Sequence, residues 1–134
     1  MHSTPLYKRF HKVHHNYNHP ISLAAEYFHP VDYFFISLLP AVLGPNLLGR
    51  NLHITTYMAW IFFQTAEAVD SHSGYEFPFG PFRLLPFSGS ATYHDFHHTN
   101  NQGNFSSYFT VLDSVFGSNF DYFTNKNTKS DTIK

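Results

Sequence analysis

The sequence predicts an all-α fold, in which an integral membrane helical hairpin carries a histidine-rich helical site at its base. Three observations lead to this expectation. Histidines recur with the spacing i, i+3, i+4 in residues 11–15 and again in residues 94–98. Two runs without acidic or basic residues, 33–49 and 51–66, lie between these clusters. Only 13% of the 134 residues are charged and 19% are aromatic, which leaves too little charge to cover an ordinary water-facing surface.

The two histidine clusters predict a shared metal site. On a helix of 3.6 residues per turn the spacing places three imidazoles on one face. One such triplet could be a polar surface stripe, but two in so short a chain favour common ligation. Imidazole suits iron, zinc, copper and nickel, and its ordinary pKa of about 6.5 leaves it neutral at cellular pH. Ligand type alone leaves iron and zinc both open. The candidate ligands are His2, His11, His14, His15, His29, His72, His94, His97 and His98.

Composition excludes several classes of function. The chain has no cysteine, which rules out iron–sulfur clusters, thiolate haem, thiol nucleophiles and disulfides. The net charge of -1 gives no basic surface for nucleic acid. The length predicts one domain, residues 1–123, followed by a polar tail, residues 124–134, that is too polar to fold alone. Any redox chemistry here would depend on a histidine-held metal.

The first helix should begin at Thr4, an N-cap followed by proline, and end near residues 16–18. Its basic residues, Lys8, Arg9 and Lys12, either form a solvated face or mark the cytosolic side of a membrane.

A second, short helix is expected over 22–28, ending at His29 because the residue before a proline avoids the helical region. His29 then either ligates the metal or caps a helix end. His19, in a turn before Pro20, is expected at the surface.

The apolar runs predict the two arms of the hairpin. Each is shorter than the roughly 20 residues that span a bilayer, although the first is at the low end of the range. Pro40 and Pro45 should kink the first arm. The alternative is a buried hairpin in a soluble helical domain. Because clusters on either side of the hairpin must meet at one centre, the chain must cross the membrane an even number of times, which places the basic segments and the metal site on the cytosolic face.

The second arm is expected to continue through Glu67 and Asp70 to His72, where residues 73–74 end it. These carboxylates are either ordinary polar residues or stand behind a ligand histidine and fix its tautomer. The loop 75–89, rich in proline, glycine and aromatics, is either a packed connector or the roof of a lipid-shaped cavity. Asp95 should point away from the histidines of its own cluster.

The last expected helix covers 104–116 and ends at Gly117. Apolar residues at 105, 108, 109, 112 and 116 give it a helical period. Core packing accounts for this stripe, and no chemistry is assigned to it.

These residues together resemble the fatty acid hydroxylase/sterol desaturase superfamily, and most closely the C4-methylsterol oxidases (methylsterol monooxygenases). The resemblance runs from residue 2 to about residue 120. It is carried by the stretches 11–15 (His-Lys-Val-His-His), 25–30 (Ala-Glu-Tyr-Phe-His-Pro), 70–78 (Asp-Ser-His-Ser-Gly-Tyr-Glu-Phe-Pro), 94–98 (His-Asp-Phe-His-His), 103–107 (Gly-Asn-Phe-Ser-Ser) and 113–117 (Asp-Ser-Val-Phe-Gly).

The resemblance implies a multi-pass enzyme of the endoplasmic reticulum membrane with a non-haem di-iron centre on its cytosolic face. Such an enzyme oxidises the C4-methyl group of sterol precursors with O2. Electrons come from NAD(P)H through cytochrome b5 or a reductase, and the other sterol C4-demethylation enzymes are its partners. No catalytic residue beyond the metal ligands and no further cofactor-binding residue is implied.

Position by position, the two triplets match the second and third histidine boxes of the superfamily, and His29 and His72 match the histidines between boxes. His2 matches only the second member of the first box, and relatives often carry a histidine where this chain has Tyr93. The resemblance therefore implies an N-terminally truncated relative. Two alternatives stay open: another lipid hydroxylase or desaturase of the superfamily, acting on a sphingoid base, a fatty acid or another sterol position, and a catalytically inactive truncated membrane protein.

Overall fold

The computed structural model describes residues 4–77 and 79–119, and in this part of the chain all regular elements are helical. Ser88 and Phe109 add one isolated antiparallel bridge. In order, the elements are α1 (Thr4–Arg9), η1 (His11–Asn16), η2 (Ser22–Glu26), α2 (Pro30–Tyr33), η3 (Phe34–Leu38), α3 (Leu39–Leu48), η4 (Gly49–Asn51), α4 (Ile54–Ser71), η5 (Pro81–Arg83), α5 (Ala91–Asn100) and α6 (Val111–Phe116). The all-α expectation is confirmed for these residues, whereas the predicted boundary after residue 123 and the tail 124–134 lie outside them.

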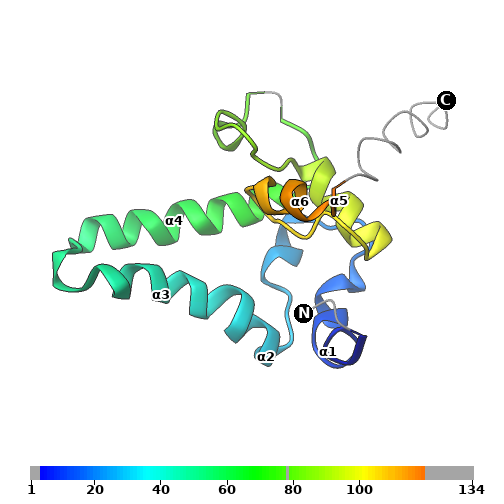
Figure 1. The fold of residues 1–134 in the computed structure, drawn as a ribbon, viewed down its shortest axis with the longest axis horizontal. Coiled ribbons are helices and arrows are strands. Elements are labelled where there is room, and N and C mark those ends of the chain that lie inside the picture. Colours follow the sequence, from blue (N-terminus) through cyan, green and yellow to red (C-terminus); the bar gives the residue numbers. More distant parts are fainter. Residues whose placement is uncertain (1–3, 78, 120–134) are drawn as a thin grey trace.

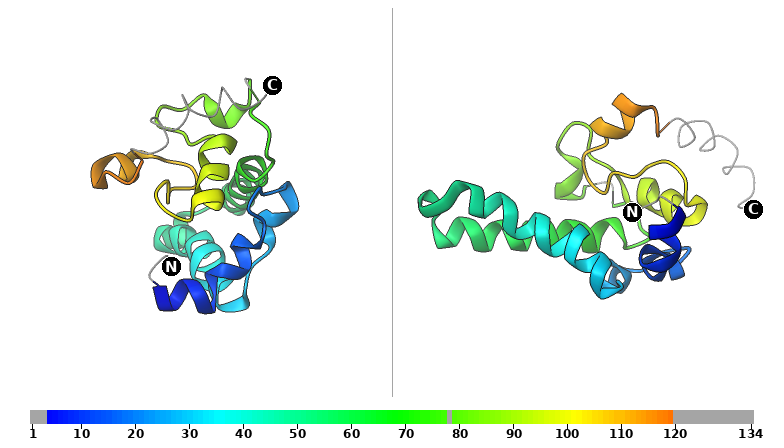
Figure 2. Two further views of the ribbon diagram at one scale, coloured as in Figure 1. Left: turned by 90° about the vertical axis from the view of Figure 1, so that its right-hand side faces the viewer. Right: turned by 60° about the horizontal axis from the view of Figure 1, so that its bottom comes forward.

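Two long helical arms project from the rest of the molecule (Figures 1 and 2). The first arm runs continuously through α2, η3 and α3, and the second is α4. They lie side by side, and the Trp60 Nε1–H donates a hydrogen bond to the Ala41 carbonyl at 3.0 Å. Within the described residues, one helix, Pro30–Leu48, is long and apolar enough to cross a membrane. The hairpin shape therefore agrees with the sequence prediction, and its position in a membrane stays a prediction.

The first arm changes helix type just before Pro40, one of the two prolines expected to kink it, whereas Pro45 lies inside α3. Phe34–Leu38 form a π-helical turn, and Pro40 follows in the first turn of α3. Proline has no N–H to donate, so the carbonyl one turn earlier loses its usual partner, and a wider turn is one way to accommodate this. The effect of the proline on the helix is thus a local change of hydrogen-bond register.

The single helix predicted from Thr4 to residues 16–18 is wrong. Phe10, with φ -127° and ψ -57°, separates α1 from η1, which is a 3₁₀ helix. Histidine, valine and asparagine are weak α-helix formers, so this segment readily takes the tighter turn. The three histidines of η1 are buried while Lys12 is exposed, so the predicted common face is retained.

The helix predicted over 104–116 is present only in its second half. Asn104 has a φ of 51°, outside the helical region, and the chain forms α6 only from Val111. The backbone N–H groups of Phe105 and Ser106 donate to the Asp113 carboxylate at 3.1 and 2.8 Å. This buried side chain takes donors that an α-helix would otherwise use. Gly117 ends α6 with a φ of +67°, as predicted.

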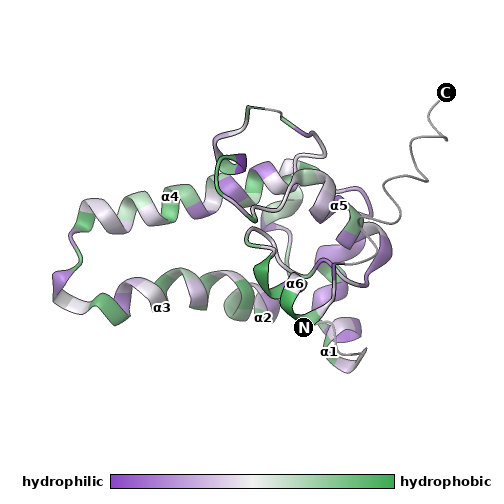
Figure 3. Cartoon of the chain, turned by 45° about the horizontal axis from the view of Figure 1, so that its top comes forward, coloured by the Kyte–Doolittle hydropathy of each residue, from purple (hydrophilic) through white to green (hydrophobic). Residues whose placement is uncertain are grey.

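The described part of the chain has a polar interior and an apolar exterior. Apart from proline, its buried aliphatic and aromatic side chains are Ala24, Ala25, Ala91 and Tyr93. The buried polar ones are His11, His14, His15, Asp32, Ser71, His72, His94, His97, His98, Asn104 and Asp113. In contrast, Leu47 and Phe62 on the hairpin are 79% and 67% exposed, and Figure 3 shows hydrophobic segments along both arms. So large an exposed apolar surface is rare in a water-soluble monomer.

Candidate metal centre

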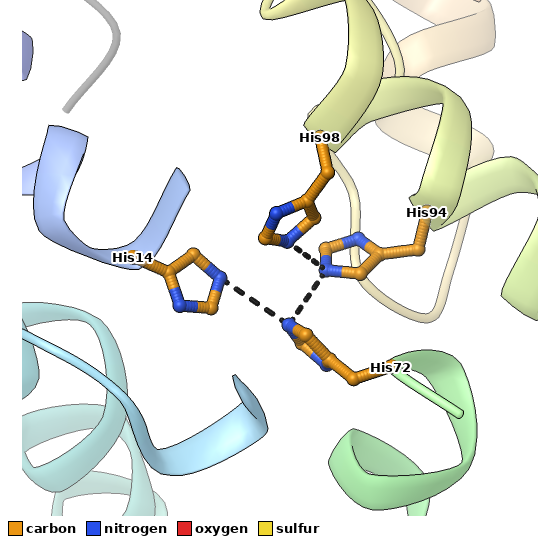
Figure 4. Close-up of side chains that lie close together, drawn as sticks. All are labelled: His14, His72, His94 and His98. Atoms are coloured by element: carbon orange, nitrogen blue, oxygen red, sulfur yellow. Dashed lines mark hydrogen bonds between the residues drawn. The ribbon is translucent and has the colours of Figure 1, made fainter. Parts of the chain in front are cut away.

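Seven buried histidines converge in two adjacent groups. His14, His72, His94 and His98 form the first group, and His11, His15 and His97 form the second; within each group one ring nitrogen per residue lies within 4.8 Å of all the others. They come from η1, from the C-cap of α4 and from α5. The rings of the first group point toward one another from three separate segments (Figure 4). The structure thus brings together residues more than eighty positions apart.

Each sequence triplet is divided between the two groups. From the first triplet, His14 belongs to the first group, while its neighbours at 11 and 15 belong to the second. From the other triplet, His97 alone belongs to the second group. The groups touch, because the ring centroids of His15 and His98 are 4.5 Å apart and those of His14 and His98 are 4.7 Å apart. We call this pair of groups the histidine centre.

Hydrogen bonds behind the rings fix which nitrogen faces inward. The Nδ1 atoms of four rings lie against backbone carbonyls: His14 on Tyr27 at 3.3 Å, His72 on Ala68 at 2.8 Å, His97 on Gly103 at 2.8 Å and His98 on Tyr17 at 3.1 Å. A carbonyl can only accept, so in the neutral ring Nδ1 carries the proton and Nε2 keeps a free lone pair. This is the arrangement that orients histidine ligands in metal sites.

The inward nitrogens are spaced as ligands of one ion would be. In the first group, Nε2 to Nε2 distances are 3.2 Å for His14 and His72, 3.0 Å for His72 and His94, and 3.2 Å for His94 and His98. With metal–nitrogen bonds of about 2.1 Å, two ligands at right angles are about 3.0 Å apart and two at the tetrahedral angle about 3.4 Å.

The electrostatics of the pair His14 and His72 also favour a bound cation. Both rings direct Nδ1 to a carbonyl, so two lone pairs face each other at 3.2 Å. That contact is unfavourable without a positive charge between the nitrogens. In the second group, the Nε2 atoms of His11 and His15 are 3.1 Å apart. The donor set therefore fits transition-metal ions.

Burial keeps the histidine rings neutral. Desolvation, followed by the proximity of the other histidines, lowers the pKa of His15 to about 3 and that of His98 to about 2. Burial also lowers the pKa of His72 to about 4 despite its hydrogen bond to Ala68. The pKa values of His14, His94 and His97 are lowered from the same first cause. Neutral imidazole is the ligand form, so the site is ready for a metal at pH 7.

His29 has a different environment from the seven clustered histidines. It is the N-cap of α2, where its Nδ1 accepts a hydrogen bond from the Val31 N–H at 3.2 Å, and its ring lies 5.0 Å from that of Phe10. It belongs to neither group. Of the two roles predicted for it, the structure displays the cap. His2 lies outside the described residues, so its assignment stays a prediction.

Asp95 and His19 lie where the sequence placed them. The Asp95 carboxylate is 3.0 Å from His19 Nδ1, on a largely exposed side chain, and not among the clustered rings.

Asp32 is a functional candidate that the sequence reasoning missed. Its carboxylate is fully buried and its Oδ2 is 2.7 Å from Nδ1 of His11. The carboxylates expected in this role were on α4, but Asp70 pairs instead with Arg83 at 2.7 Å, and Glu67 lines a cavity. A signal was present: Asp32 is an acidic residue at the very start of an apolar run, where burial is costly without a partner.

Asp113 supports α5 through a hydrogen bond to Tyr93. Its Oδ2 accepts hydrogen bonds from the Tyr93 hydroxyl at 2.7 Å and from the Ser106 N–H. Tyr93 lies next to His94 in sequence, so this contact fixes the helix that presents three of the seven rings.

A cavity of about 490 Å³ adjoins the histidine centre. It is lined by His11, His14, His72, His94 and His97, and on its other sides by Ala25, Phe28, Ile36, Ser37, Gln64, Glu67, Ala68, Phe105 and Ser107. A small molecule, or one end of a larger one, could therefore reach the histidine centre through this cavity.

The fold and the site define a class: helical proteins with an apolar helical hairpin and a buried polyhistidine centre at its base. The fatty acid hydroxylase family model matches residues 1–118. This chain therefore belongs to the fatty acid hydroxylase family, as its histidine boxes indicated.

Curated relatives place the chain near the methylsterol monooxygenases. It is 39% identical over 127 residues to a putative methylsterol monooxygenase of Dictyostelium discoideum, covering 95% of this chain and 46% of the relative. It is 42% identical over 121 residues to a methylsterol monooxygenase of Aspergillus fumigatus, covering 87% and 39%. It is 40% identical over 125 residues to a very-long-chain aldehyde decarbonylase of Oryza sativa, covering 91% and 46%. The chain thus spans less than half the length of these relatives. No solved structure gives a significant match.

Proposed function

We propose that this chain forms the metal-binding half of a methylsterol monooxygenase, which oxidises the C4-methyl group of sterol precursors with O2. The observation that carries the proposal is the histidine centre itself: seven buried imidazoles in two touching groups, six from the two distant boxes and one, His72, from the end of α4. The relatives named methylsterol monooxygenase support the choice of substrate. The proposal includes two non-haem iron ions, one for each group, and the seven histidines as their ligands. His2, by position in the first box, remains a candidate eighth ligand.

Paired iron would supply the activation of O2 that an unactivated methyl C–H bond requires. The chain's own residues have supporting tasks. Backbone carbonyls hold the Nδ1 protons of four rings, and Asp32 faces Nδ1 of His11, which keeps the orientation of these five rings constant. Burial keeps the rings neutral and excludes bulk water from the centre. The apolar lining next to the rings, such as Phe28 and Ile36, accommodates a hydrocarbon and not a hydrated substrate.

We also propose that the hairpin lies in a membrane, with the histidine centre at the cytosolic face. Pro30–Leu48 has 19 residues, a helical length of about 28 Å, close to the thickness of a bilayer core of about 30 Å. Both arms expose large apolar side chains, which lipid would cover. The two arms start and end near the centre, so a sterol dissolved in the bilayer would reach it directly (Figure 1). The endoplasmic reticulum, NAD(P)H, cytochrome b5 or a reductase, and the other C4-demethylation enzymes complete the proposal.

Metal analysis combined with turnover tests this function. Membranes containing the chain, together with NAD(P)H, cytochrome b5 and its reductase, are given a 4,4-dimethylsterol under O2. We expect about two iron ions per chain and products oxidised at the C4-methyl carbon. A matched variant, His72→Ala, should lose one ion and the products, whereas His19→Ala should retain both, because His19 is exposed and outside the histidine centre. One zinc ion and no oxygen-dependent product would contradict the proposal.

The rice relative provides the second candidate. Its name assigns it a very-long-chain aldehyde as substrate, and the cavity beside the histidine centre could receive an acyl chain. The same membranes are therefore tested with a long-chain aldehyde. Conversion of the aldehyde with no change in the sterol would favour this candidate.

A further inference from the structure

A second cavity shares two polar lining residues with the one beside the histidine centre. It has a volume of about 540 Å³ and is lined by Pro40, Trp60, Phe63, Gln64, Glu67, Pro81, Phe82, Leu85, Tyr108 and Phe109. Gln64 and Glu67 line both cavities. They are one turn apart on α4, so they face the same side of the helix. The loop that the sequence suggested as a roof supplies Pro81, Phe82 and Leu85.

The two shared residues present buried oxygens without partners. Oε1 of Gln64 and Oε1 of Glu67 are inaccessible to solvent and have no hydrogen-bond partner among the described residues. The nearby cation, Arg83, is in ion pairs with Asp70 at 2.7 Å and Glu76 at 3.3 Å. A buried acceptor without a donor is costly, and native proteins usually satisfy it or reserve it for a ligand.

The rest of the second cavity is apolar and aromatic. Trp60, Phe63 and Phe82 offer flat hydrocarbon surface, while the acceptors lie at the end nearest the histidine centre. Sites for small lipophilic ligands have this composition, with a few polar groups that fix orientation. The second cavity, of about 540 Å³, therefore offers an apolar body and one polar end, as an elongated lipid with a single polar group requires.

We propose that this second cavity is the binding site for the sterol rings, and that Gln64 and Glu67 accept a hydrogen bond from the sterol 3-hydroxyl. The inference rests on the proposed function and adds the residues that would orient its substrate. In a sterol the hydroxyl-bearing carbon C3 is bonded to C4, the carbon whose methyl group would be oxidised. Acceptors between the apolar cavity and the histidine centre therefore hold the hydroxyl where the C4-methyl enters the cavity lined by the rings.

Hydrogen-bond polarity separates this ligand from the competing lipids. Oε1 of Gln64 and Oε1 of Glu67 are acceptors that lack a donor among the described residues. An alcohol can supply that donor, whereas an aldehyde offers only an acceptor. The pair Gln64 and Glu67 thus favours a hydroxylated lipid over an aldehyde.

Ligand binding, measured without turnover, tests the inference. The chain in lipid nanodiscs is titrated with a radiolabelled 4,4-dimethylsterol, its 3-O-methyl ether and its 3-ketone. A hydrogen bond to two buried acceptors that otherwise lack a donor predicts that the free alcohol binds about 10- to 100-fold more tightly than either analogue. In Glu67→Leu this ratio should fall to about threefold or less, and in Gln64→Leu to an intermediate value.

Matched controls use polar residues outside the second cavity. Glu26→Leu changes an exposed carboxylate at the end of η2, and Gln102→Leu changes an exposed amide; both should retain the full ratio. If Glu67→Leu fails to fold, the ratio for the unchanged protein and for Gln64→Leu decides the matter. Equal binding of the alcohol and its ether, or tighter binding of a long-chain aldehyde, would overturn the inference.

The binding test is independent of the oxidation test. Sterol oxidation with no preference for the free hydroxyl would leave the proposed function standing and overturn the role of Gln64 and Glu67. Sterol binding that depends on the hydroxyl, in a chain that oxidises nothing, would support the role of Gln64 and Glu67 and overturn the proposed function.

Discussion

Replacing Asp32 by alanine removes the carboxylate behind one ring of the second histidine group. Its Oδ2 is 2.7 Å from His11 Nδ1, and the side chain is fully buried. Loss of such a partner typically weakens metal binding 10- to 100-fold, or by about 1.4–2.8 kcal/mol. Asp32→Asn retains a possible acceptor and loses the charge, so its effect should be smaller.

The assay is a competition titration with a chromophoric chelator, using Co(II) as a spectroscopic substitute for iron. Because His11 belongs with His15 and His97, only one of two bound ions should be weakened. The unchanged protein should show two tight equivalents, and Asp32→Ala one tight and one weak. Asp95→Ala is the matched control, since that carboxylate contacts the largely exposed His19. Two tight equivalents in Asp32→Ala, or equal weakening of both, would refute the division of histidines argued above.

Three further predictions concern stability. Asp113→Ala removes the acceptor for Tyr93, Phe105 and Ser106, and should cost about 2–4 kcal/mol in chemical unfolding; a loss below about 0.5 would contradict this. Gly103→Ala should destabilise by about 1–3 kcal/mol, since φ is +70° and the added Cβ would lie 2.5 Å from the Ser118 carbonyl; unchanged thermal unfolding would show that the turn relaxes freely. In metal-free protein, burial lowers the pKa of His72 to about 4, so below pH 6.5 the unfolded chain binds more protons than the folded one. Stability should be complete above pH 6.5 and fall as the pH falls toward about 4, and a flat profile would be inconsistent with neutral buried rings.

The metal-binding character of the chain was predictable because it is local. The triplet spacing identifies histidines that share a face whether the turn is α or 3₁₀, and all six triplet histidines are in the observed groups. The sequence could not predict that His14 joins the first group and His97 the second, because this depends on how η1 faces α5 in space. Spacing along one element carries no information about the position of another element.

Two of the missed features involve a buried carboxylate. The segment 104–110 has a helical apolar period, but the Asp113 carboxylate takes the N–H donors of Phe105 and Ser106. Asp32 stands at the start of an apolar arm, and its buried partner His11 is 21 positions away. In both cases the partners of one buried carboxylate, which the apolar pattern does not reveal, decide what the segment does.

The polar interior makes the lifetime of this chain depend on its metal. Imidazoles occupy the place that leucines and valines fill in most domains, so a bound ion would hold together segments that little apolar packing joins. With iron as the proposed ion, we expect iron-starved cells to degrade the newly made chain faster than iron-replete cells, which pulse-chase labelling would measure.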